Sequence, residues 1–278
     1  MDLPRYTTLH VAVAGGIARI QLDNPPVNTL SAAMMIELHD LLERLRDDTD
    51  VRVLLFSSSH EEFFLAHVDM GIFEHLKELE PVAARFPQVN VHQGIGELLR
   101  TQPQVSIVKL SGIARAGGAE FVIAADLAFA ATETARIGQT EALLGILPGG
   151  GATQYLLERV GRSRALELVL SAELLDADTA AQYGWINRAI PAAELDAYVD
   201  KLATDIAAVG SDLIAAAKRA LPAADLTPGL RVEHDEWSAL VTGERSAKIM
   251  AAAVEHGMQT LENERDVEGF LRGLAAGR

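Results

Sequence analysis

The chain has 278 residues, 49% of them hydrophobic and 23% charged, which is the balance of a globular protein long enough to bury a sizeable core. It contains no cysteine, and this excludes disulfides, thiolate zinc sites, cysteine-ligated iron–sulfur clusters and cysteine nucleophiles. Its 39 acidic and 24 basic side chains give a net charge of −15. This charge argues against a broad nucleic-acid or anionic-membrane surface, because phosphate binding needs clustered Lys and Arg.

The sequence carries no signature of targeting, membrane insertion or metal binding. The first ten residues have neither the basic nor the apolar region of a signal peptide. No apolar run reaches the roughly 18 residues that a membrane helix needs. The eight histidines show no H-x-x-x-H spacing. We therefore expect a cytoplasmic protein with no membrane attachment and no metal site.

A β-hairpin followed by a helix is predicted at the start of the chain. Two apolar runs flank a Gly-Gly pair over 10–23, which is typical of a hairpin, and the Asn-Pro-Pro turn at 24–26 ends the second strand. Ser31 is predicted to be the N-cap of a helix, because apolar residues recur at helical spacing after it.

Strands and helices continue to alternate beyond this point. Residues 70–101 are predicted to be helical, with breaks near Pro81 and Pro87, and a Gly-rich loop at 148–151 leads into another helix. This alternation predicts an α/β architecture. Apolar runs predict strands at 51–57, 63–65, 104–110 and 127–131.

The last third of the chain is predicted to be mainly helical, interrupted by a short strand near 185–190. Helices over 194–220 and 231–262, with a proline between them, could form a separate layer. We therefore divide the chain into an α/β core, 1–193, and a helical C-terminal region, 194–278.

One strand-to-helix turn has the features of a catalytic site. Gly117 and Gly118 let the backbone turn tightly and let a ligand approach the main chain. Amides at a helix start lack intrahelical partners and face the positive end of the helix dipole, which suits an oxygen that acquires negative charge. Glu120 lies about one helical turn further along, so its carboxylate could reach the same cleft. Alternatively, the glycines simply end a strand and Glu120 is a solvated first-turn carboxylate. Glu141, in a GQTEALLG stretch, allows the same two interpretations.

Three loop segments carry a family resemblance when they are read together. They are AHVD at 66–69, GIARAGGAEFVIAADLAFA at 112–130, and IGQTEALLGILPGGGATQ at 137–154. In this order and spacing they resemble the enoyl-CoA hydratase/isomerase family, the crotonase superfamily, with its A-G-x-D loop and its G-x-A-x-G-G-G-x-E segment. The likeness runs from about Gly16 to about Ala220.

The resemblance implies a crotonase-like fold, in which an α/β core of repeated ββα units forms a spiral and a helical C-terminal region makes trimer contacts. It implies an acyl-CoA thioester as substrate, with no separate cofactor, and a homo-oligomer that is a trimer or a dimer of trimers. By matched position, the backbone N–H groups of Val68 and Gly117 would form an oxyanion hole, and Glu120 and Glu141 would be the catalytic glutamates. The matched residues that would line the substrate site are Pro26, Val27, Ala66, His67, Asp69, Met70 and Thr140.

The presence of both glutamates favours hydration of an enoyl-CoA to a 3-hydroxyacyl-CoA. Two carboxylates facing one water can orient it, take its proton as it attacks the β-carbon and supply a proton to the α-carbon, provided that one of them stays protonated. Relatives that only move a double bond often keep just the second glutamate, and dienoyl isomerases and some dehalogenases have an aspartate where this chain has Gly149. One alternative is another enolate reaction on an unusual acyl-CoA: isomerisation, C–C cleavage or thioester hydrolysis. Another is a catalytically idle relative that acts as a binding or RNA-associated protein, against which the net charge and the two glutamates argue.

The chain departs from the family pattern in the segments nearest the predicted site. His67 replaces the glycine of the A-G-x-D loop, and its side chain either contacts the ligand and titrates near neutral pH or points away. Arg115 and the alanine after it replace Leu-Gly. Arg115 either recognises a carboxylate on the acyl group or, as we favour, pairs with a structural acid. The C-terminus lacks the family's Lys-rich segment, which leaves Lys77, Arg85 and Arg272 as candidates to hold the CoA phosphates.

Overall fold

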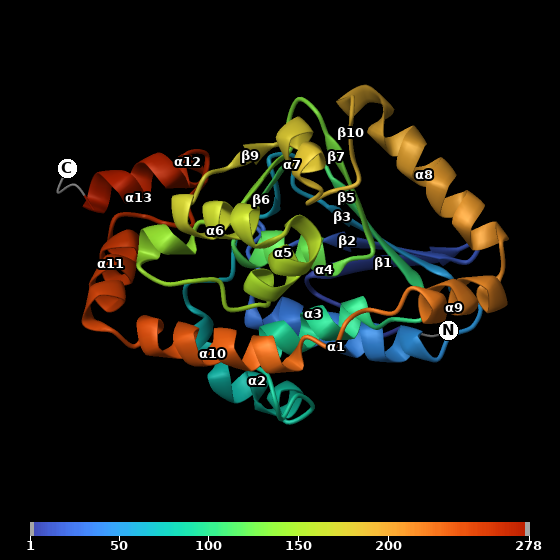
Figure 1. Cartoon of the computed structure of the whole chain (residues 1–278), viewed down its shortest axis with the longest axis horizontal. Helices are drawn as coiled ribbons and strands as arrows, with labels where there is room; N and C mark the ends of the chain where they lie inside the picture. Colours follow the sequence, from blue (N-terminus) through green and yellow to red (C-terminus); the bar gives the residue numbers. More distant parts are fainter. Residues whose placement is uncertain (1–2, 276–278) are drawn as a thin grey trace.

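The computed structural model describes residues 3–275, and a six-stranded sheet forms its centre (Figure 1). The strand order is β1-β2-β3-β5-β7-β10, in which β1 and β2 are antiparallel and every later neighbouring pair is parallel. Gly15 and Gly16, at φ +61° and +79°, form the tight turn of the predicted hairpin. The strands are β1 (Leu9–Ala14), β2 (Ile17–Leu22), β3 (Val53–Ser58), β5 (Val105–Leu110), β7 (Leu127–Ala131) and β10 (Arg188–Ile190).

A second, four-stranded sheet consists of short strands in the order β4-β6-β8-β9. Along the chain, β4 follows β3, β6 follows β5 and β8 follows β7, and helical residues come after each of these pairs. The chain therefore repeats a ββα unit, as the family resemblance predicts. The strands of this sheet are β4 (Phe63–Leu65), β6 (Ile113–Arg115), β8 (Arg136–Gly138) and β9 (Leu175–Asp176).

Local sequence signals set the helices of the core. Ser31 accepts a hydrogen bond from the Met34 amide at 3.3 Å and caps α1, as predicted. Of the two breaks predicted near Pro81 and Pro87, the structure has one, over 84–90. The helix α2 runs through Pro81 to Ala83, because the amide that proline lacks removes only one bond from a helix that ends two residues later. The helices are α1 (Ala32–Arg46), η1 (Ile72–His75), α2 (Leu76–Ala83), α3 (Val91–Arg100), α4 (Gly117–Ala124), η2 (Glu141–Leu144), α5 (Ala152–Val160), α6 (Arg162–Ser171) and α7 (Ala177–Tyr183).

The C-terminal region is helical but more divided than predicted. Glycines separate its helices, as at Gly210 and Gly257, whose φ values of +88° and +90° are costly for other residues. In Figure 1, α10 runs beneath α5, against which it packs, and α8 packs on the six-stranded sheet. These helices are α8 (Ala192–Ala208), α9 (Ser211–Ala220), α10 (Thr227–Val241), α11 (Glu244–Glu255), α12 (Leu261–Glu264) and α13 (Val267–Ala275).

The predicted division at 193/194 falls in the first turn of α8 and stays a prediction. The outer ends of the two predicted regions, 1–2 and 276–278, lie outside the described residues. Of the helices that the structure describes, none has the length and apolar character needed to cross a membrane.

Candidate active site

Glu120 lies in α4, close to a turn where the backbone is tightly packed. A Cβ atom on Gly118 would overlap the carbonyl oxygen of Leu65, so only glycine fits there. Ala116, just before the helix, has φ +47° and ψ −123°, a conformation that L side chains rarely adopt. Every residue of α4 is buried, so the interpretation of Glu120 as a solvated carboxylate is wrong.

The carboxyl group of Glu120 is held by the Gly-rich loop. Its Oε1 accepts hydrogen bonds from the amides of Gly150 at 2.7 Å and Ala152 at 3.0 Å. Burial raises the pKa of Glu120 to about 7, while the two donating amides act in the opposite direction. A carboxyl group with a pKa near neutrality can both accept and release a proton at physiological pH.

Glu141, at the start of η2, is also buried, as is Thr140 at the N-cap of that helix. Burial, and next the charge of Glu120, raise the pKa of Glu141 well above its usual value. With its side-chain amide oriented to donate, Gln139 places Nε2 at 2.9 and 3.0 Å from the two Glu141 oxygens. The two glutamates therefore lie in different surroundings, and burial favours the protonated form of Glu141.

The two amides predicted to form an oxyanion hole lie close together. A Cβ on Gly117, the first residue of α4, would be 3.4 Å from the Val68 nitrogen. Val68 forms an isolated parallel bridge with Leu30, and the amide of Leu30 donates to the His67 carbonyl. Within the part of the chain that the structure describes, neither the Val68 N–H nor the Gly117 N–H donates to a backbone carbonyl. Their donation to a ligand oxygen stays a prediction.

A third buried carboxylate, Glu233 of α10, is not predicted by the sequence analysis. Its Oε1 accepts from the Gly151 amide at 2.6 Å and from Gln93 Nε2 at 2.9 Å. Its Oε2 accepts from the Thr153 amide at 2.9 Å and the Thr153 hydroxyl at 2.6 Å. Burial, and next the charge of Glu120, raise the pKa of Glu233 to about 7. No sequence signal separates Glu233 from the exposed acids of the same helix.

His92 and Trp237 are two further residues beside the Gly-rich loop that the sequence does not predict. Nδ1 of His92, on α3, lies 3.5 Å from Glu120 Oε2, and its side chain is 13% exposed. Burial lowers the pKa of His92 to about 4, so its ring is neutral at physiological pH. Trp237 of α10 stands over Gly149, where a Cβ would lie 2.8 Å from the indole ring, and stacks on Phe73 of η1. Trp237 therefore occupies the space that a side chain at 149 would need.

The residues predicted to line the substrate site have varied surroundings. Val27 and Ala66 are fully buried in one small apolar cluster. Pro26 is exposed, and Asp69 and Met70 are partly buried on the loop after β4. Their contacts with substrate stay predictions.

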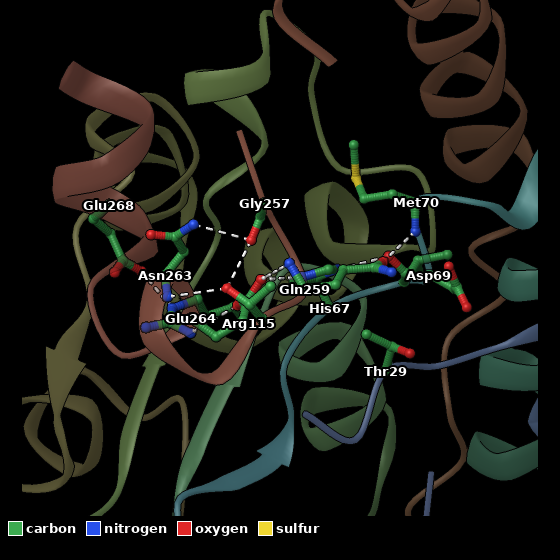
Figure 2. Close-up of polar contacts among 12 residues, drawn as sticks. Thr29, His67, Asp69, Met70, Arg115, Gly257, Gln259, Asn263, Glu264 and Glu268 are labelled. Atoms are coloured by element: carbon green, nitrogen blue, oxygen red, sulfur yellow. Dashed lines mark hydrogen bonds and ion pairs between the residues drawn. The ribbon is translucent and has the colours of Figure 1, made fainter. Parts of the chain in front are cut away.

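The side chains of His67 and Arg115 are directed to the C-terminal region (Figure 2). Nε2 of His67 lies 2.9 Å from Glu264 Oε1. Arg115 donates through Nε to Glu268 Oε1 at 2.6 Å, and its Nη1 lies 3.6 Å from Glu264 Oε2. Arg115 therefore pairs with acidic side chains of the protein, as the sequence favours, and His67 contacts Glu264 of α12.

The three cations predicted to hold the CoA phosphates are not gathered into one site. Lys77 lies on α2, and Arg85, just beyond it, has Nη2 at 3.9 Å from Glu43 Oε2. Arg272 is on α13, which lies away from α2 in Figure 1, and donates to the Ser171 carbonyl at 2.9 Å.

The repeated ββα units and the buried carboxylates beside a strand-to-helix turn define an α/β protein of the crotonase fold. The family model "Enoyl-CoA hydratase/isomerase" matches residues 12–262. The chain therefore belongs to the enoyl-CoA hydratase/isomerase family, as its motifs predict.

Individual relatives agree with this membership. The crystal structure of a "putative enoyl-CoA hydratase" from Streptomyces avermitilis has a TM-score of 0.96 and 57% identity, over 98% of this chain and 100% of that one. The crystal structure of an enoyl-CoA hydratase from Bacillus anthracis has a TM-score of 0.71 and 26% identity, over 92% and 98% of the two chains. The crotonyl-CoA hydratase of Syntrophomonas wolfei is 28% identical over 243 residues, which cover 86% of this chain and 92% of the relative.

Proposed function

We propose that the protein is an acyl-CoA-binding hydro-lyase that adds water across the 2,3-double bond of an enoyl-CoA to give a 3-hydroxyacyl-CoA. The observation that carries this proposal is the pair of buried glutamates, Glu120 and Glu141, both of whose pKa values burial raises. They share the site with two amides, of Val68 and Gly117, that have no backbone acceptor among the described residues. The names of the relatives support the same reaction.

Each group has a distinct part in the proposed reaction. The amides of Val68 and Gly117 polarise the thioester carbonyl and hold the enolate; one such donor contributes about 3–4 kcal/mol to transition-state stabilisation. Glu120, held by two backbone amides, takes a proton from water as the oxygen bonds to the β-carbon. Glu141 supplies a proton to the α-carbon, for which its raised pKa suits it. Water thus adds with no other reactant and no cofactor.

We propose that the enzyme works as a homotrimer or a dimer of trimers in the cytoplasm, with acyl-CoA as its ligand and no nucleic-acid partner. The C-terminal helices offer exposed apolar side chains for subunit contacts, such as Leu213 on α9 and Val232 on α10. The negative net charge weighs against RNA.

A second candidate is another enolate reaction on an unusual acyl-CoA, by isomerisation, C–C cleavage or thioester hydrolysis. His92 favours it, because a neutral imidazole 3.5 Å from Glu120 adds a hydrogen-bonding group that the proposed hydration does not use. Trp237 weighs against the variants that use an aspartate at position 149, because it fills that space.

A spectrophotometric assay of the purified protein with crotonyl-CoA tests the proposal. Loss of the conjugated-thioester absorbance, with 3-hydroxybutyryl-CoA as the product, is the expected result. No loss with the ester still tightly bound would favour the second candidate. Failure to bind any CoA ester would overturn both.

A further inference from the structure

Four buried or mostly buried ionisable side chains connect the C-terminal region to the two segments that carry the predicted oxyanion-hole amides (Figure 2). His67 directly precedes Val68, and Arg115 ends β6 two residues before Gly117. Their acidic partners belong to α12 and α13 and are Glu264 and Glu268.

Glu264 contacts both segments with one carboxylate. Its side chain is 0% exposed, as is that of Arg115. Glu264 Oε1 lies 2.9 Å from His67 Nε2 and also accepts a hydrogen bond from the backbone amide of Gln259 at 3.0 Å. Oε2 faces Arg115 Nη1 at 3.6 Å. Within the described residues, Oε2 has no hydrogen-bond partner, so the arginine charge is its main compensation.

The imidazole of His67 transmits this contact to the backbone beside Val68. Nδ1 lies 2.7 Å from the Val68 carbonyl oxygen while Nε2 faces the Glu264 carboxylate. While Glu264 is ionised both partners are acceptors, so both ring nitrogens then carry a proton and His67 is an imidazolium. Burial alone would lower the pKa of His67, but the hydrogen bond and charge of Glu264 raise it. The C-terminal segment also contacts this loop two residues after Val68, because Gln259 Oε1 accepts a hydrogen bond from the backbone amide of Met70 at 2.6 Å.

Arg115 connects the segment before Gly117 to the acidic side chains of the C-terminal region. Its guanidinium is buried, and Nε donates to Glu268 at 2.6 Å. Nη1 and Nη2 make no hydrogen bond within the described part of the chain. A buried cation is stable only beside compensating charge, so the end of β6 is fixed relative to Glu264 and Glu268.

We infer that Glu264 is a positioning residue that sets the spacing of the Val68 and Gly117 amides by holding the segment before each of them. This inference rests on the proposed function, since it gives those amides their role. It also accounts for two departures from the family pattern together, because His67 and Arg115 are both partners of Glu264. The family-model match ends at residue 262, so Glu264 and Glu268 lie just beyond the matched segment.

Isotope-edited infrared spectroscopy of bound butyryl-CoA, labelled with ¹³C at the thioester carbonyl, tests the inference. This saturated ester cannot be hydrated, and its carbonyl stretch moves to lower frequency when an oxyanion hole polarises it. The variants are Glu264→Gln, which can still accept from His67 but cannot neutralise Arg115, and Glu264→Leu, which can do neither. Glu62→Gln is the matched control, because the exposed Glu62–Arg265 pair also joins the C-terminal segment to the core.

The carbonyl shift is expected to decrease from wild type to Glu264→Gln to Glu264→Leu, and to be unchanged in the control. The kcat for crotonyl-CoA should fall about tenfold or more in Glu264→Leu, because oxyanion-hole donors act mainly on the transition state. KM should stay within about twofold. A purely structural role for Glu264 would lower thermal stability without changing the carbonyl stretch of the folded fraction.

An equal carbonyl shift in wild type and in folded Glu264 variants would overturn the inference and leave the proposed function standing. No shift in the wild type, or no binding of butyryl-CoA, would instead refute the predicted oxyanion hole and with it the proposed function. If neither Glu264 variant folds, His67→Gln decides: it removes the imidazolium but leaves Glu264 paired with Arg115. A wild-type carbonyl shift in His67→Gln would then overturn the inference.

Discussion

Glu120 and Glu233 accept hydrogen bonds from alternate backbone amides of a single four-residue stretch, 150–153. Glu120 takes the first and third amides, at 2.7 and 3.0 Å, and Glu233 takes the second and fourth, at 2.6 and 2.9 Å. This stretch leads into α5, where the amides have no intrahelical partner and the helix dipole favours negative charge. One acid comes from the core and the other from α10. The C-terminal region therefore contributes directly to the surroundings of the predicted catalytic pair.

The substitution Glu233→Gln should slow hydration and move its pH dependence. Both carboxylate oxygens of Glu233 accept from backbone amides of the 150–153 stretch, which also holds Glu120. The side-chain nitrogen of a glutamine cannot accept a hydrogen bond, so one of these backbone amides would lose its acceptor. We expect kcat to fall about tenfold, because small displacements of catalytic groups are costly. The charge of Glu233 helps to raise the pKa of Glu141, so the high-pH limb of the rate profile should shift to lower pH.

Steady-state kinetics from pH 5.5 to 9.5 would measure both effects, since roughly this range brackets the titrations near neutrality. Glu236→Gln, at an exposed position of the same helix, is the control and should behave as wild type. A wild-type rate and profile in Glu233→Gln would show that the contact is only structural.

The substitutions Glu120→Gln and Glu141→Gln should each reduce kcat about 100- to 10,000-fold, the usual contribution of a general acid or base. Each keeps the size of the side chain and removes a buried ionisable group, so the fold and the binding of butyryl-CoA should persist. Stopped assays with crotonyl-CoA and calorimetric titration with butyryl-CoA would separate chemistry from binding. Wild-type turnover by both variants would refute the assignment of the site.

Hydration by the wild type should rise with pH through about 7, because Glu120 must be ionised to accept the proton from water and burial raises its pKa to about 7. The groups that face it are Glu141, Glu233 and the neutral ring of His92. At higher pH the rate should fall as Glu141 loses its proton. A rate that is flat from pH 6 to 8, a window of roughly one unit on each side of neutrality, would contradict this assignment.

The same raised pKa predicts how stability depends on pH. Between the unfolded pKa of glutamate, about 4.3, and the folded value near 7, the folded state binds more protons than the unfolded state, so the free energy of unfolding decreases as pH rises. Glu120→Gln removes one of these groups. The difference in Tm between low and neutral pH should therefore be smaller in this variant than in the wild type, which calorimetry can measure.

Much of the fold follows from short-range patterns, and the site follows from them only in part. The Ser31 cap and the hairpin turn depend on neighbours within a few residues, so the sequence predicts them. Motifs next to strand ends predict Glu120 and Glu141. Glu233 contacts an amide 82 positions away, and Glu264 contacts His67 across 197 positions. Helical periodicity identifies the helix in such cases, but not which of its acids is buried against which loop.

The backbone at Ala116 predicts a stabilising substitution. Its φ of +47° and ψ of −123° are a backbone conformation that favours glycine. For an alanine this conformation costs about 1–3 kcal/mol of folding free energy. Ala116→Gly removes this strain, while the greater freedom of glycine in the unfolded chain opposes the gain by roughly 0.5–1 kcal/mol. The net expectation is a gain of about 1 kcal/mol, seen as a rise in Tm of roughly 2–4 °C. Ala119→Gly, inside the same helix, is the control and should destabilise by about 1 kcal/mol or more, because its backbone is helical and its methyl group is buried. A decrease in Tm for Ala116→Gly would mean that the backbone before Gly117 is not strained.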